Sequence, residues 1–144
     1  MREVVVALGL LGLSLTTLLA VDPARLATLH LDLPHYHDVY THELKEWIDY
    51  GQPLVILDVR TKDYDDGKRL PKALLFPYDN SNEQISATLP NKEAQIVVYC
   101  TNEQSPTSQY FANRLVALGY RNVYKYPEGI AAWEKAGYPI DISK

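Results

Sequence analysis

The stretch IVVYCTNEQSP, residues 96–106, indicates the fold of this chain more directly than any other. Its apolar half predicts a buried strand, and its polar half predicts a loop before a helix, with Ser105 as the N-cap and Pro106 at the first helical position. Cys100 ends the strand among free backbone N–H groups, which favour the thiolate, the reactive form of cysteine. A small buried hydrophobe is the alternative interpretation of this residue.

Composition limits the classes of protein that this chain can belong to. Its 144 residues suffice for one domain with a core, and 47% hydrophobic with 22% charged residues is ordinary for a globular protein. The formal charge of −4, without a cluster of Lys and Arg, argues against a nucleic-acid partner. Cys100 is the only cysteine, which excludes an intramolecular disulfide.

The N-terminal residues 1–21 resemble a signal peptide or a signal anchor. An apolar run covers residues 4–20 and follows Arg2. The run is long for a cleaved signal and short for a spanning helix, and Leu18 fits poorly at the cleavage position that needs a small residue. We expect an uncleaved anchor that tethers the protein to a membrane, with a cleaved signal as the second interpretation and a buried helix as the third. Either of the first two predicts an exported domain, periplasmic or otherwise extracytoplasmic.

Residues 22–40 are expected to form a linker. They contain Pro23 and Pro34 and show no clear period. The linker also holds three of the four histidines, which are His30, His35 and His37. Their spacing matches no specific ligand pattern, so a polar tether outside the core is favoured over a weak metal site, and no metal is assigned.

The remaining chain alternates between helical and strand patterns. Helical patterns begin at Thr41 and cover 106–118 and 130–135, and strand patterns cover 54–57, 96–99 and 122–126. A short strand is expected within residues 70–77 and a short helix within residues 80–89. This order predicts an α/β fold with a mostly parallel sheet flanked by helices. Sites in such sheets lie at the carboxyl ends of the strands, where both Asp58 and Cys100 fall.

Several short motifs then resemble those of the rhodanese family. LDVR at 57–60 resembles the family's DVR strand end, and residues 64–73 resemble its EY..GHIPGA stretch. VYC at 98–100 resembles the strand that leads to the catalytic cysteine, and residues 128–140 resemble its GG...W...GYP ending. Each motif is weak alone, but their order and spacing imply a rhodanese-like domain over residues 41–142.

The resemblance implies sulfur transfer through a persulfide on Cys100. A small sulfur donor would load the cysteine, and a thiophilic acceptor or a thiol-bearing protein would unload it, without a metal or organic cofactor. The backbone of the loop would cradle the anionic persulfide, which makes its five residues the expected substrate-binding residues: Thr101, Asn102, Glu103, Gln104 and Ser105. Asp58 and Arg60 are expected to support this loop rather than to react.

The chain also departs from the family's pattern. The loop carries no basic residue and includes Glu103, which would weaken attraction for the thiosulfate dianion. Lys68 and Arg69 replace a single expected residue, and they either supply positive charge to the pocket or form a solvated turn. The acidic loop keeps open an alternative function, a non-catalytic module for partner binding or redox sensing. A phosphatase is disfavoured because Arg114 lies too far along its helix to close the loop.

Overall fold

The computed structural model of this chain describes residues 33–143. The predicted leader, residues 1–21, and most of the predicted linker lie outside the described residues, so export and the membrane tether stay predictions. None of the helices in the described part has the length and apolar character needed to cross a membrane.

The core of the fold is a sheet of five parallel strands in the order β1-β6-β5-β2-β4. The strands are β1 (His37–Asp38), β2 (Leu54–Asp58), β4 (Leu74–Leu75), β5 (Gln95–Tyr99) and β6 (Asn122–Tyr126). β5 lies at the centre, with Val97 opposite Ile56 of β2 and Tyr124 of β6. Because β5 is paired on both sides, its carboxyl end is fixed in position where Cys100 follows.

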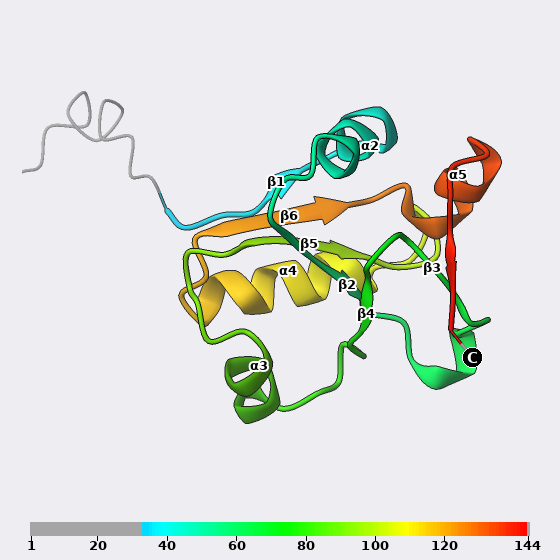
Figure 1. Cartoon of the computed structure of the whole chain (residues 1–144). Helices are drawn as coiled ribbons and strands as arrows, with labels where there is room; N and C mark the ends of the chain where they lie inside the picture. The colour runs from blue at the N-terminus through cyan, green and yellow to red at the C-terminus, as the bar shows by residue number, and fades with distance from the viewer. Residues whose placement is uncertain (1–32, 144) are drawn as a thin grey trace, which may run out of the picture. The chain divides into compact units, whose positions relative to one another are not determined.

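Helices cover both faces of this sheet (Figure 1). The helices are α2 (Thr41–Asp49), α3 (Asn82–Thr88), α4 (Thr107–Ala117) and α5 (Gly129–Lys135). Alternate strand residues point to opposite faces, so Val97 packs with α2 and α5, while Val98 packs with α3 and α4. The predicted α/β fold with a mostly parallel, helix-flanked sheet is therefore confirmed.

The N-terminus of α2 is held by a carboxylate from another part of the chain. No side chain within α2 caps it, but Glu128 accepts hydrogen bonds from the backbone N–H of Thr41 at 2.7 Å and from its hydroxyl at 2.5 Å. A negative charge at a helix N-terminus is favourable, and here it joins α2 to the connection between β6 and α5. This contact gives Glu128 a structural role.

Two predicted boundaries are wrong. The predicted linker ends too late, because β1 pairs with β6 and Val39 is fully buried, with its N–H bonded to Lys125 O at 2.9 Å. The predicted start of the 106–118 helix is one residue early, because α4 begins at Thr107 and Pro106 is its N-cap. Ser105 makes no capping bond, since its hydroxyl contacts Cys100 and Thr107 instead.

The polar segment 61–69 contains more structure than its sequence indicates. It forms the short 3-10 helix η1 (Lys62–Tyr64) and the strand β3 (Lys68–Arg69), which pairs antiparallel with β7 (Asp141–Ile142). The backbone N–H of Ser143 donates to Gly67 O at 2.8 Å. The C-terminal end of the chain thus holds the segment that follows Arg60.

Candidate active site

Cys100 lies at the inner wall of a cavity of about 520 Å³ at the carboxyl end of β5. The residue is only 6% exposed. The loop side of the cavity is formed by Thr101, Asn102, Gln104, Ser105, Pro106 and Thr107. The other lining residues are Arg60, Thr61, Tyr64 and Tyr78. The cavity is therefore lined both by the loop after β5 and by the segments that follow β2 and β4.

The N-terminus of α5 sets the backbone of the loop. The N–H groups of Ile130 and Ala131 donate to the carbonyl oxygens of Cys100 and Thr101 at 3.1 and 3.0 Å. In a trans peptide the C=O of one residue and the N–H of the next point in opposite directions, so the amides of Thr101 and Asn102 point away from α5. Among residues 33–143, neither amide donates to a protein acceptor. Both remain available to bind an anion.

Ser105 is the side chain that contacts the sulfur. Its Oγ donates a hydrogen bond to Cys100 Sγ at 3.0 Å and lies 3.2 Å from Thr107 Oγ1. Because a hydroxyl has one proton, Ser105 donates it either to the sulfur or to Thr107 Oγ1, but not to both at once. The Ser105 hydroxyl therefore supplies one hydrogen-bond donor directed at the sulfur.

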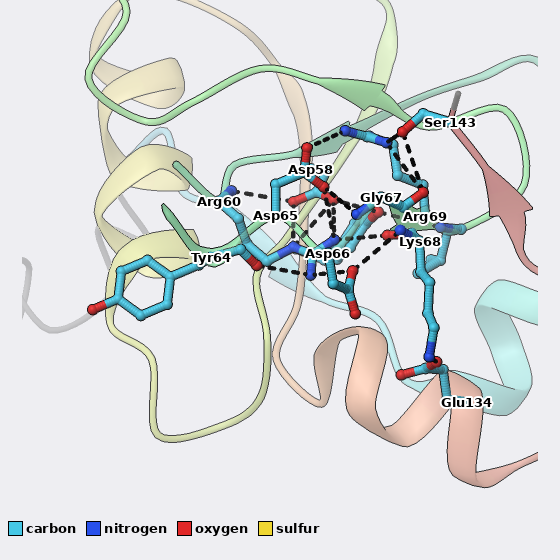
Figure 2. A network of polar contacts seen from close by, with 12 residues as sticks. Asp58, Arg60, Tyr64, Asp65, Asp66, Gly67, Lys68, Arg69, Glu134 and Ser143 are labelled. Atoms are coloured by element: carbon cyan, nitrogen blue, oxygen red, sulfur yellow. Dashed lines mark hydrogen bonds and ion pairs between the residues drawn. The ribbon is translucent and has the colours of Figure 1, made fainter. Parts of the chain in front are cut away.

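Arg60 is fully engaged with the protein. Its Nε and Nη2 donate to Asp58, Nη2 also donates to Lys68 O, and Nη1 donates to Tyr64 O and Asp66 (Figure 2). Burial opposes the charge of the guanidinium, but the hydrogen bonds and charge of Asp58 outweigh it and raise the pKa of Arg60 above its ordinary value. Every guanidinium N–H is used, so Arg60 has no donor left for a bound anion.

Asp58 lies at the centre of a buried polar group. Besides Arg60, it accepts a hydrogen bond at 3.1 Å from the hydroxyl of Tyr99, which itself accepts one from Leu70 N at 3.2 Å. Burial, together with the nearby charge of Asp58, raises the pKa of Tyr99 well above its ordinary value. Asp58 and Arg60 were expected to support the loop 101–105, but their side chains bond to each other, to Tyr99 and to residues 64–68 instead. Tyr99 was not expected in this group because the sequence marks it only as a buried strand residue.

Lys68 and Arg69 do not line the cavity. Lys68 pairs with Glu134 at 2.7 Å, and Arg69 pairs with Asp65 at 2.6 Å and bonds to Ser143 (Figure 2). Both expected roles are therefore wrong for Arg69, which is only 7% exposed and is neither a solvated residue nor a charge in the pocket. The C-terminal residues that pair with it are too distant in sequence for this contact to be predicted.

The structure separates the five predicted loop residues. Four of them line the cavity of Cys100, while Glu103 is exposed and lines two smaller hollows instead. The expectation that Glu103 places its charge in the pocket is not met. Tyr64 and Tyr78, by contrast, line the cavity but were not predicted as site residues, because exposed tyrosines carry no distinctive sequence signal.

The described residues include no group of three or more His, Cys, Asp or Glu side chains placed to hold a metal ion. The rings of His35 and His37 pack edge to face with centroids 4.6 Å apart. His30, the third histidine of the predicted linker, lies outside the described residues.

Residues 40–136 match the profile of the rhodanese-like domain. The chain belongs to the rhodanese-like domain family. This match confirms the resemblance seen in the motifs. A search of curated protein sequences found no significant match.

Solved structures show the same fold. A protein from Bacillus halodurans is 23% identical, with 83% of this chain and 86% of that chain covered and a TM-score of 0.66. The rhodanese-like domain of an Anabaena protein is 25% identical, with 74% and 79% covered and a TM-score of 0.65. A thiosulfate sulfurtransferase from Pseudomonas aeruginosa is 20% identical, with a TM-score of 0.65. The similarity covers 76% of the present chain and 21% of the sulfurtransferase.

Proposed function

We propose that this rhodanese-like domain is a sulfurtransferase that carries sulfur as a persulfide on Cys100. The observation that carries the proposal is the position of the cysteine. Cys100 lines a cavity, and its sulfur accepts a hydrogen bond from Ser105. The next two residues, Thr101 and Asn102, have backbone N–H groups that donate to no acceptor among residues 33–143. These donors suit a thiolate before the reaction and a persulfide anion after it.

The reaction consists of two displacements at sulfur. The Cys100 thiolate attacks the outer sulfur of the donor, a sulfur–sulfur bond forms, and the rest of the donor leaves as an anion. An acceptor thiolate or cyanide then attacks the outer sulfur of the persulfide and releases the Cys100 thiolate. Sulfur moves as a neutral atom in both steps, so no external oxidant or reductant is consumed.

The charges around the cavity favour donors other than thiosulfate. Arg60 is the only lysine or arginine among the lining residues, and Asp58 and Asp66 already pair with it. A dianion therefore gains little attraction from the wall of the cavity. Donors with lower charge, or with sulfur bound to an organic thiol, fit this lining better.

The intact mass of the protein tests the proposal. Treatment of the purified chain with a sulfane-sulfur donor should add one sulfur atom, and cyanide should remove it as thiocyanate. Because Cys100 is the only cysteine, a thiol-bound adduct has a single location. Cys100→Ser should keep the fold but accept no sulfur and show no turnover. Turnover by this variant equal to that of the wild type would end the proposal, and a wild type that takes sulfur from no donor would favour a non-catalytic module.

A further inference from the structure

Tyr64 is an exposed aromatic residue on a fixed backbone. Its side chain is 73% exposed and lines the cavity of Cys100. Its N–H donates to Thr61 O at 3.0 Å, and its carbonyl accepts from Arg60 Nη1 at 3.2 Å. Figure 2 shows the ring extending away from the polar network that holds its backbone. Hydrogen bonds, one of them from the buried Arg60, thus fix the backbone of Tyr64 while its ring is exposed to solvent.

Tyr78 is a second aromatic wall of the same cavity. Its N–H donates to Val59 O at 3.1 Å, and its carbonyl accepts from Arg114 at 3.0 Å. Its ring is 36% exposed and meets the ring of Tyr110 edge to face, with centroids 6.0 Å apart. Tyr110 does not line the cavity, so it supports Tyr78 from the outside. Two tyrosines with fixed backbones therefore line the same cavity as Cys100.

The size of the cavity indicates an organic ligand. Its volume of about 520 Å³ falls within the range of sites for organic molecules, about 300–1,000 Å³. Such sites combine aromatic walls with a few polar groups, as Tyr64 and Tyr78 do here with the loop amides and Ser105. Since Arg60 has no free donor, the lining favours ligands that make a large contact with the aromatic walls over ligands with a high negative charge.

We propose that Tyr64 and Tyr78 bind the organic group of the sulfur donor, which makes an organic persulfide or thiosulfonate the preferred donor class. This inference rests on the proposed sulfur transfer. With a thiosulfonate, the Cys100 thiolate bonds to the terminal sulfur, the sulfur–sulfonyl bond breaks, and a sulfinate leaves with the electron pair. The rings hold the organic group that departs with the sulfinate.

Benzenethiosulfonate and methanethiosulfonate test the proposal because they share the reacting group and differ in the organic group. The wild type should prefer the phenyl donor in kcat/KM. Tyr64→Ala and Tyr78→Ala should each reduce this preference by about threefold to tenfold, the value of one aromatic contact. Tyr64→Phe should retain it, and Tyr50→Ala, at an exposed tyrosine outside the cavity, should leave it unchanged. An unchanged preference in both cavity alanine variants would overturn the proposal.

A binding measurement separates this inference from the proposed function. Benzenesulfinate should slow the alkylation of Cys100 by iodoacetamide more than methanesulfinate does, even in a protein that transfers no sulfur. Tyr64→Ala should reduce this difference, and the exposure of Tyr64 makes the variant compatible with folding. Equal protection by the two sulfinates in the wild type would rule out an aromatic recognition site, whatever the outcome of the sulfur-loading assay.

Discussion

At the residue scale, Ser105 is the side chain whose hydroxyl acts directly on the sulfur of Cys100. A hydrogen bond to a charged acceptor contributes about 1.5–3 kcal/mol. Ser105→Ala should therefore slow both alkylation of Cys100 and sulfur loading by about tenfold or more. Samples quenched at successive times measure the rate of alkylation, and intact mass measures the rate of sulfur loading.

The control for Ser105 is a variant that keeps the hydroxyl. Ser105→Thr should retain most of the alkylation rate, because its Oγ1 can still donate to Cys100. Thr107→Val removes only the contact behind Ser105 and should have a smaller effect than Ser105→Ala. Equal rates for wild type and Ser105→Ala would show that the loop amides alone stabilise the sulfur anion.

At the scale of elements, Gly129 is the point where α5 meets the loop of Cys100. It has a φ of +66°, and a Cβ here would lie 2.6 Å from the carbonyl oxygens of Cys100 and Thr101. Gly129→Ala should cost about 1–2 kcal/mol for the left-handed backbone and about 1–3 kcal/mol more for the clash. Because the clashing atoms belong to the loop, we also expect sulfur loading to fall. Denaturant unfolding and the mass assay measure the two effects.

Gly137→Ala provides the matched control for Gly129→Ala. Gly137 has a similar φ of +73°, but a Cβ there meets nothing within 4 Å. This variant should show only the cost of the left-handed backbone and should load sulfur normally. If both variants lose stability equally and load sulfur equally, the close approach of α5 does not position the loop.

The elements predicted from sequence are those with a long apolar period. β5 and β6 and the helix that begins at Thr41 were predicted within a residue, because each buries several side chains in a regular pattern. β1, β3 and β7 were missed because a strand of two residues shows no period, and its existence depends on a partner elsewhere in the chain. β4 is equally short, and it was expected only because it lies within the largely apolar residues 70–77. The candidate site follows the same rule: Cys100 and Asp58 end long strands, whereas Tyr64 and Tyr78 come from connections.

At the scale of the whole molecule, two phenols are buried on the face of the sheet that packs against α2 and α5. Burial raises the pKa of Tyr126 to about 12, with the charge of Glu128 adding to the effect and the hydrogen bond with Thr41 opposing it. The pKa of Tyr99 is also raised, as described above. In both cases the folded state holds the phenol proton more tightly than the unfolded state does.

Linkage turns these pKa shifts into a loss of stability at alkaline pH. Below pH 10.0, the ordinary pKa of tyrosine, both phenols are protonated in either state, and their contribution is complete. Between pH 10.0 and about 12 the unfolded chain releases protons that the folded chain retains, so the free energy of unfolding falls as the pH rises.

The Tyr126→Phe variant should be less stable than the wild type at neutral pH, because it loses the hydrogen bond with Thr41. Its free energy of unfolding should decline less steeply as the pH rises. Denaturant titrations across this range measure the slope, with Tyr50→Phe as an exposed control. A Tyr126→Phe curve as steep as that of the wild type would show that Tyr126 does not titrate with unfolding.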